Sequence, residues 1–442
     1  MPKLLWVSPL SVHDTASSSA TQMRNMLLSL KARDVDIVGL SALNFVNEKG
    51  TSMFSDLDEK LKSQENSFNL NDNNITFIYV RTKSRNLGDM VSQEQRNFYA
   101  KFCSIINAFR PDVVMGSGAD MLSMVCFDET KRRGIPTAYV LLDGTPRRFN
   151  FPNIDVVISD SRAIANLYAQ QYHINVVVTG SFLPITSPLL AAKAAEQKAA
   201  EEAANKDAET TDKDQKGAEQ KGNKSDKSKT PKRNRITMIN PALDKGVAIF
   251  TRLAQMAAKE TKGYKFTVYE TYEGQFKQQI EQVHQKNSDK KAFTNADLNK
   301  IEVLGPQVAN TELLETTKLL VVPSLSFEGI VNIAREAIAC GIPVLATNQM
   351  GLAESIGEAG VLVEMPSYCI ADNRIAPEPE DMSNCLKGLQ LALSEDFAER
   401  CANVTKRYDV NLSANRLAMI LKPLFDQRAG NNPQLLRNGS LI

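Results

Sequence analysis

The sequence predicts an α/β protein with two domains, each built on a parallel sheet in a Rossmann-like order of elements. Three observations support this prediction. The chain has 442 residues, which favours two or three domains at about 100–200 residues each. Short apolar runs alternate with amphipathic, helix-length segments in both halves. Between the halves, residues 191–234 contain no Val, Ile, Leu, Met or aromatic residue and cannot contribute to a core.

The composition excludes several classes of function. A net charge of +1 argues against a nucleic-acid binder driven by bulk electrostatics, so no nucleic-acid partner is expected. Six cysteines occur without a Cys-x-x-Cys pair and with only three histidines, which argues against a zinc site and favours reduced thiols in a cytosolic protein. No apolar run approaches the ~18–20 residues of a membrane span, and the first residues carry no signal-peptide pattern. The prediction is a cytoplasmic protein without an integral membrane segment, with peripheral attachment left open.

In the first half, apolar runs and helical periodicity alternate in order along the chain. We expect strands at 3–7, 35–40, 75–80, 111–115, 137–142, 154–159 and 176–179. Amphipathic patterns predict helices at 21–31, 93–109 and 162–171. Strand, loop, helix and strand in this order form βαβ units, whose strands run parallel with right-handed crossovers.

The second half repeats this alternation. We expect strands at 235–239, 266–269, 301–304, 319–322 and 343–346. Helices are expected at 247–258, 271–285, 311–317, 330–340, 379–393, 395–408 and 412–426. Gly341 and Pro343 end the helix at 330–340, because Gly just past a helix and Pro soon after it stop helices.

The block from 321 to 364 carries the chemistry of the second half. Glu328 lies in the expected strand-to-helix loop, at the strand end where ligands of parallel sheets collect, and Glu336 lies eight positions later inside the helix. Between them, the backbone N–H groups of Gly329, Ile330 and Val331 are expected to open the helix without intrahelical partners, which suits a phosphate. The two carboxylates can accept hydrogen bonds from sugar or ribose hydroxyls.

A Glu, seven residues, a second Glu and then Ala-Ile-Ala-Cys-Gly-Ile-Pro-Val resembles the donor-site signature of retaining GT-B glycosyltransferases of the family 4 type, the glycosyl transferases group 1. The turn at 351–354 is similar to the Gly-x-Pro-Glu turn of that family. The resemblance implies two Rossmann-like domains whose parallel sheets face each other across a cleft. It also implies transfer of a sugar from a nucleoside-diphosphate sugar with retention of configuration. The nucleotide sugar is a co-substrate, and neither a cofactor nor a metal is implied.

Residue by residue, the resemblance assigns roles in the donor domain. Glu328 is expected to hold sugar hydroxyls, and Glu336 the ribose. Lys245, in an Asp-Lys-Gly turn, is expected to stabilise the leaving diphosphate, so Glu328 and Lys245 are the catalytic candidates. Asn240 stands where the family usually has an arginine, and Gly305 follows the strand that lines the base pocket. An exposed lysine at a helix start is the alternative reading of Lys245.

The first domain matches the family less closely. Small residues, among them Ser17 and Ser18, occupy the loop that is usually glycine-rich, and the alternative is a polar loop with a helix N-cap. Ser117 stands where the family often has a histidine. His13 could reach the acceptor side from the first loop, or it could be structural. Arg335 is expected as a surface partner of a neighbouring acid.

The predicted organisation is an acceptor domain at 1–190, a solvated insertion at 191–234, a nucleotide-sugar domain at 235–410, a helix at 411–427 that crosses back to the first domain, and a flexible tail at 428–442. The acceptor is unidentified and can be a glycan, a lipid, a protein or a small molecule. Two other functions stay open. One is a different nucleotide-sugar enzyme such as an epimerase, and the other is a binding or scaffold protein that has lost turnover.

Overall fold

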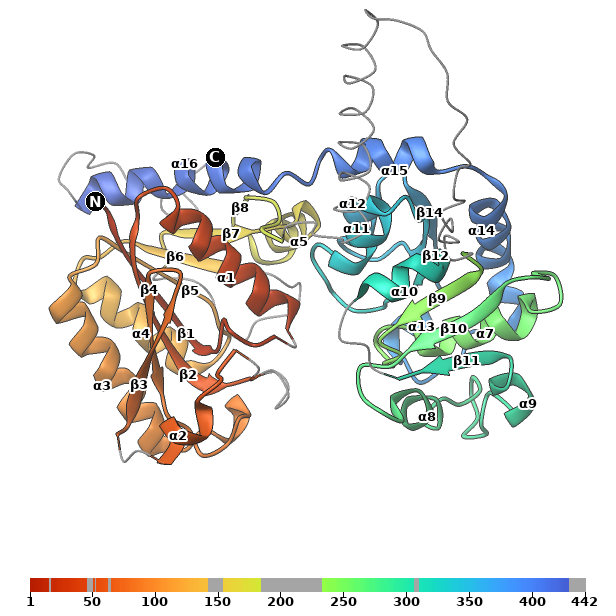
Figure 1. Ribbon diagram of the computed structural model, residues 1–442, viewed down its shortest axis with the longest axis horizontal. Coiled ribbons are helices and arrows are strands. Elements are labelled where there is room, and N and C mark those ends of the chain that lie inside the picture. Colours follow the sequence, from red (N-terminus) through yellow and green to blue (C-terminus); the bar gives the residue numbers. More distant parts are fainter. Residues whose placement is uncertain are drawn as a thin grey trace, which may run out of the picture. The chain divides into compact units, whose positions relative to one another are not determined.

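The structure is a computed structural model that describes residues 1–15, 17–45, 51, 53–62, 65–141, 154–183, 233–305 and 310–428. The chain divides into two compact units. The first comprises Met1–Pro184, Phe327–Asn332 and Tyr408–Ile442, and the second comprises Ile185–Ser326 and Ile333–Arg407. In Figure 1 the sheet of the first unit is coloured red to yellow and that of the second green to blue. Residues 191–232 of the predicted insertion and the tail after residue 428 lie outside the described residues.

The first unit is built on an eight-stranded sheet of order β3-β4-β2-β1-β5-β6-β7-β8. All neighbouring strands pair in parallel except β3 and β4. Strand β1 is buried at six consecutive positions, because helices cover both faces of such a sheet. The strands are β1 (Lys3–Leu10), β2 (Asp36–Asn44), β3 (Ser67–Asp72), β4 (Ile75–Val80), β5 (Val113–Gly116), β6 (Thr137–Leu141), β7 (Val156–Ser159) and β8 (Val176–Val178).

Amphipathic helices cover this sheet. Met23, Met26, Leu27 and Leu30 of α1 face the core, as their spacing predicts. The last helix, α16, contributes Ala414, Leu417, Leu421 and Leu424 to the same core cluster as β1. The helices of this unit are α1 (Ser18–Lys31), α2 (Leu57–Lys62), η2 (Leu87–Asp89), α3 (Ser92–Phe109), α4 (Met121–Arg132), α5 (Arg162–Tyr172) and α16 (Val410–Arg428).

The second unit has a six-stranded, wholly parallel sheet of order β11-β10-β9-β12-β13-β14. The strands are β9 (Arg235–Ile239), β10 (Lys265–Tyr269), β11 (Ile301–Leu304), β12 (Thr317–Val322), β13 (Val344–Thr347) and β14 (Gly360–Val363). The first strand of the unit, β9, lies between β10 and β12, so the strand order reverses there. In open α/β sheets this reversal marks the crevice in which ligands bind.

The helices of the second unit connect its parallel strands and pack on the sheet. They are α7 (Val247–Ala257), α8 (Gln275–Ile280), α9 (Asn295–Leu298), α10 (Asn310–Thr316), α11 (Asn332–Ala339), α12 (Leu352–Ile356), α13 (Ser367–Ala371), η3 (Pro379–Met382), α14 (Ser383–Ser394) and α15 (Ala398–Thr405). Both units therefore have the predicted Rossmann-like architecture. Within the described ranges, no helix is long and apolar enough to span a membrane.

Several predicted bounds were wrong. The helix expected at 271–285 is limited to α8, because a left-handed glycine, Gly274, delays its start and Gln282–Val283 already turn away. The edge strand β3, whose exposure does not alternate regularly, was missed together with β14 and the short helices α2 and α9. These elements are short, and three of them have little apolar pattern of their own.

Candidate functional site

Two loops meet at the strand reversal of the second unit. Residues 240–246 follow β9, and residues 323–326 follow β12. The Leu325 amide donates to the Asp244 carbonyl at 2.8 Å. Gly246 has a left-handed backbone (φ +82°), and a Cβ at this position would lie 1.9 Å from the Pro323 carbonyl oxygen. Only glycine therefore fits where the Asp-Lys-Gly turn crosses the second loop.

Lys245 is held at this crossing. Its ammonium group donates to the Ser326 hydroxyl at 3.1 Å and lies 3.7 Å from the Asp244 carboxylate. The lysine side chain is 26% exposed, so it is not the exposed helix-start lysine of the alternative reading. Burial lowers the pKa of Lys245, and Asp244 opposes this shift. A half-buried cation at the ligand edge of a parallel sheet suits a phosphate group.

Hydroxyl groups connect the lysine to the core of the unit. Ser326 and Ser324 form a hydroxyl–hydroxyl hydrogen bond of 2.8 Å, and the Ser324 hydroxyl donates to the Asp244 carbonyl at 3.5 Å. At the end of β13, Thr347 donates from its hydroxyl to the Ser324 carbonyl. Ser324 and Thr347 are each 1% exposed. The sequence-based prediction missed these three residues, although the Pro-Ser pair at the end of an apolar run marked the place.

Asn240 has a structural task in the same loop. Its backbone is left-handed (φ 58°), a conformation that asparagine adopts more readily than most residues. Its side-chain oxygen accepts a hydrogen bond of 2.6 Å from Gln275. The Asn240 side chain is thus directed into the unit and is no substitute for an arginine. Gly305, directly after β11, is exposed, and a Cβ added there meets no atom within 4 Å.

The start of α11 differs from the prediction. The helix begins at Asn332, and Gly329 and Ile330 form a bend before it. The amides of 329–331 therefore precede the helix instead of opening it. Glu328 is half-buried and lies in the segment between β12 and this bend.

Two neighbouring residues of α11 differ in burial. Glu336 is half-buried, inside the helix as predicted. Arg335 is 1% exposed, so its prediction as a surface residue was wrong. Arg335 is buried together with Ala334, Ala337, Ile338 and Ala339 of the same helix. No residue spacing in the sequence predicts that Arg335 is buried.

In the first unit, His13 is enclosed in a hydrogen-bonded network. Its side chain is 0% exposed, and its Nε2 lies 3.0 Å from Asp72 Oδ2. Because a carboxylate only accepts, Nε2 carries the proton, and Nδ1 accepts from the Tyr79 hydroxyl at 2.6 Å. Arg24 donates to both oxygens of Asp72, at 2.6 and 2.8 Å. The Ser11 hydroxyl lies 2.9 Å from the Tyr79 oxygen.

The charges of this network are balanced internally. Burial lowers the pKa of His13, which keeps the imidazole neutral. Burial alone would raise the pKa of Asp72, but the hydrogen bonds from His13 and Arg24 hold it well below its usual range. Burial also raises the pKa of Tyr79. His13 therefore has a structural environment and does not line a binding surface.

The three candidate serines of the first unit differ in their local contacts. Ser17 is the N-cap of α1, where its hydroxyl accepts from the Ala20 amide at 3.2 Å. Ser18 is the first residue of the helix and is exposed. Ser117 follows β5, with its hydroxyl 3.4 Å from the Ser8 hydroxyl and 3.2 Å from the Met23 sulfur. The three serines have separate local surroundings, and no hydrogen bond joins them among the described contacts.

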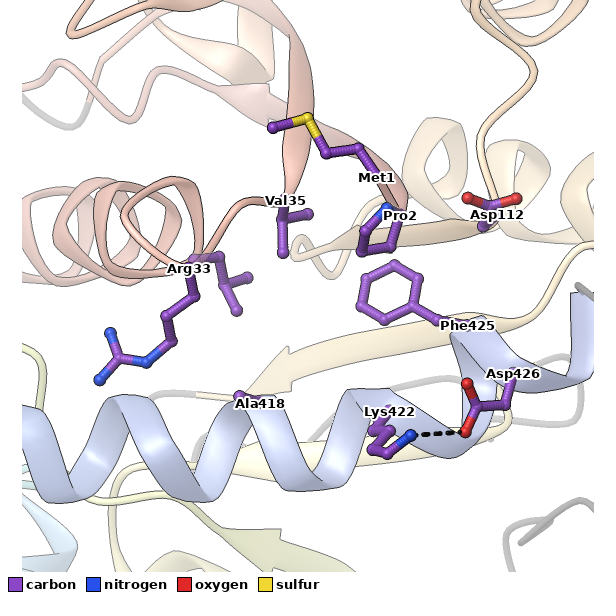
Figure 2. Close-up of a pocket in the computed structure, with 10 residues that line it drawn as sticks. Met1, Pro2, Arg33, Val35, Asp112, Ala418, Lys422, Phe425 and Asp426 are labelled. Atoms are coloured by element: carbon purple, nitrogen blue, oxygen red, sulfur yellow. Dashed lines mark hydrogen bonds and ion pairs between the residues drawn. The ribbon is translucent and has the colours of Figure 1, made fainter.

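A cavity of the first unit lies away from these serines. Its volume is about 490 Å³, and Figure 2 shows residues that line it, with Lys422 directed to the Asp426 carboxylate. Pro2 and Asp112, which also line it, precede β1 and β5, so the cavity lies at the amino edge of the sheet. Ligands of open parallel sheets bind at the opposite, carboxyl edge.

The fold defines the class of the protein. The chain has the GT-B fold, which it shares with a glycosyltransferase of Rickettsia africae at 15% identity and a TM-score of 0.58 over 98% of this chain and 99% of that one. Sucrose-phosphate synthase of Thermosynechococcus elongatus gives 12% identity and a TM-score of 0.60 over 97% and 100% of the two chains. Anabaena HepE in complex with UDP gives 16% and 0.56 over 96% and 100%.

A match to a protein family lies mostly in the second unit. Residues 241–372 match the family model described as glycosyl transferases group 1. This segment contains both loops of the candidate site and the signature block with Glu328 and Glu336. The predicted resemblance to the glycosyl transferases group 1 is thus confirmed over this segment, while the family 4 type and the retaining mechanism stay predictions. A comparison with curated proteins finds no match.

Proposed function

We propose that the protein transfers a sugar from a nucleoside-diphosphate sugar to an acceptor, with retention of configuration and without a metal ion. The observation that carries the proposal is Lys245, a half-buried ammonium group held by Ser326 at the strand reversal of the second unit. This unit contains most of the segment that matches the glycosyl transferases group 1, all but residues 327–332. Anabaena HepE, which shares the fold, is described in complex with UDP-glucose.

In this reaction the bond between the anomeric carbon and the phosphate oxygen breaks, and the acceptor oxygen forms a new bond to that carbon. The leaving diphosphate takes the negative charge and receives the acceptor proton. Lys245 stabilises this charge in a site from which water is partly excluded, where a fixed cation acts more strongly than in water. Glu328 and Glu336 are proposed to hold the sugar hydroxyls and the ribose.

The lysine needs to be charged for this role. Its pKa is lowered by burial, while the Asp244 carboxylate 3.7 Å away favours the charged form. When a diphosphate binds, two further negative groups favour the ammonium and offset the cost of its burial. The acceptor is unidentified, and the proposal extends to a glycan, a lipid, a protein or a small molecule.

A cytoplasmic location is part of the proposal. None of the six cysteines of the chain forms a disulfide bond, and five of them are buried. Burial raises the pKa of Cys385 and of Cys401, which keeps these thiols protonated and unreactive. Such cysteines are typical of a reducing compartment.

The test begins with a thermal-shift panel of UDP, GDP, ADP and CDP and their sugars, followed by calorimetry with the best binder. We expect Lys245→Ala to weaken diphosphate binding by about 30-fold, since a hydrogen bond to a charged group contributes about 2 kcal/mol. Lys262→Ala, an exposed lysine of the same unit, is the matched control and should leave the affinity unchanged. Equal affinities of the two variants would contradict the diphosphate role.

Glu328→Ala tests the chemical step. We expect hydrolysis or transfer of the bound sugar to fall by about 100-fold, because hydrogen bonds that position the sugar act in the transition state. Glu380→Ala, in the exposed η3 segment, serves as the control. Unchanged turnover in Glu328→Ala would show that the assignment of this carboxylate is wrong.

A second candidate function is a nucleotide-sugar-binding protein without turnover. One observation favours it, namely that Asn240 replaces the usual arginine and directs its side chain to Gln275. A site with one fixed cation has less charge to stabilise a leaving diphosphate than a site with two. Tight donor binding without hydrolysis or transfer would favour this second function.

A further inference from the structure

Ser324 and Ser326 form a directed chain of hydrogen bonds to Lys245. An ammonium group has three donors and no acceptor, so Lys245 donates to Ser326, and the hydroxyl hydrogen of Ser326 is left for another acceptor. That acceptor is the Ser324 oxygen, 2.8 Å away. The hydroxyl hydrogen of Ser324 in turn points to the Asp244 carbonyl at 3.5 Å.

This chain closes on itself. It starts at the ammonium group of Lys245 and ends at the carbonyl of the preceding residue, so both ends belong to the same turn. The turn cannot move away from the second loop, since Gly246 lies directly against Pro323 and the Leu325 amide is bonded to Asp244. The position of the ammonium group is therefore determined by Ser326 and not by the flexible lysine stem alone.

The base of the chain is buried and fixed. Ser324 is 1% exposed, and its carbonyl accepts from Thr347, which ends the adjacent strand β13. Hydrogen bonds anchored in a buried region lose little entropy when a ligand binds, so the group at their end is preorganised. A lysine side chain that is not held in this way loses rotamer entropy when a ligand fixes it.

We propose that Ser326, supported by Ser324, is the positioning residue for the diphosphate-binding lysine. The inference rests on the proposed function, in which Lys245 binds the diphosphate of the donor. Ser326 orders the side chain of Lys245 before the donor binds. Its loss weakens recognition of the diphosphate and leaves recognition of the nucleoside unaffected.

The experiment compares Ser326→Ala with the unaltered protein by calorimetry. The probes are the best-binding diphosphate among UDP, GDP, ADP and CDP and the matching nucleoside monophosphate. We expect the diphosphate affinity of Ser326→Ala to fall about tenfold and the monophosphate affinity to change less than twofold. Ser326→Thr keeps the hydroxyl and should restore most of the diphosphate affinity. Ser394→Ala, at the exposed end of α14, is the control for the substitution itself.

The outcomes separate the two proposals. An unchanged diphosphate affinity in Ser326→Ala, or an equal loss for both probes, overturns the positioning role and leaves the proposed function standing. Failure of Ser326→Thr to restore binding also overturns it, provided that the variant melts at the temperature of the unaltered protein. If the unaltered protein binds no nucleoside diphosphate, the proposed function fails and takes this inference with it.

Discussion

The polar clusters of the two units differ in how their cations are held. In the second unit, the chain from Ser324 to Lys245 begins in the core and ends in a cation that is 26% exposed. In the first unit, the His13 side chain is 0% exposed, and Arg24, which is 21% exposed, is held by both oxygens of Asp72. The two cations differ in their partners, because Arg24 is paired with a carboxylate at 2.6 Å, whereas the Asp244 carboxylate lies 3.7 Å from Lys245. This difference is the reason why the proposed diphosphate role falls to Lys245.

The largest expected effect tests the close contact beneath the lysine. Gly246→Ala places a Cβ about 1.9 Å from the Pro323 carbonyl oxygen, in addition to the strain of a left-handed backbone. We expect the free energy of unfolding to fall by about 4 kcal/mol and diphosphate binding to be lost. Denaturation with urea, followed by circular dichroism, measures the stability.

Gly274→Ala is the matched control for this substitution. Gly274 is also a helix N-cap with a left-handed backbone, φ 78°, but a Cβ there meets no atom within 4 Å. We expect a cost of only about 1–2 kcal/mol from the backbone strain. Similar losses in both variants would show that the contact with Pro323 does not constrain the loop.

The second prediction concerns the hydrogen-bonded network around His13. Asp72→Ala removes the carboxylate that accepts from His13 and Arg24, and leaves both buried or half-buried donors without it. Removing one partner of a buried ion pair costs about 3–5 kcal/mol, and Arg24 is 21% exposed, so we expect about 3 kcal/mol. Donor binding by the second unit should be retained.

Asp36→Ala supplies the comparison within the same unit. Asp36 pairs with Lys31 at 3.8 Å, but its side chain is 41% exposed. An exposed pair of this kind contributes about 0–1 kcal/mol. If both aspartates cost the same, the network around His13 has no special structural weight.

The network also predicts how stability depends on pH. The pKa of His13 is lowered in the folded state, so the unfolded chain binds the proton first, near its ordinary value of about 6.5. Stability is therefore complete above this pH and falls as the pH drops, by at most about 1.4 kcal/mol per pH unit for one proton. The depressed pKa of Asp72 adds a second loss below about pH 4.

His13→Gln isolates the first of these two losses. Glutamine keeps a donor and an acceptor but does not titrate, so we expect a flatter stability curve between pH 7 and about pH 5.5. Urea unfolding at several pH values compares the two proteins. An unchanged slope would assign the loss to another group of the chain.

Local pattern determined how much of the fold could be predicted. The bounds of β4 and β9 agree with the sequence to the residue, because both strands are short runs of mainly β-branched, aromatic and apolar residues. The α11 helix was placed two residues too early, since Gly329 and Ile330 form a bend and the helix begins only at Asn332. Short polar elements such as β3 leave no such pattern.

The residues of the candidate site also differ in whether the sequence could identify them. Glu328 and Lys245 belong to motifs that are contiguous in the chain, and the resemblance of these motifs to a family signature made them candidates. The partners of His13 are 59 and 66 residues away, and no spacing in the sequence connects them. Likewise, Ser326 meets Lys245 over a separation of 81 residues, which only the strand order of the folded unit explains.

The smallest expected effect distinguishes a binding loop from a helix cap in the first unit. Ser17→Ala removes the hydroxyl that accepts from the Ala20 amide, which should cost about 1 kcal/mol. Ser18→Ala, one residue later in an exposed helical position, should change stability by less than about 0.5 kcal/mol. Urea unfolding of both variants measures this difference. If Ser18→Ala instead impairs transfer while stability is unchanged, the exposed start of α1 contacts the acceptor, and ligand chemistry is shared between the two units.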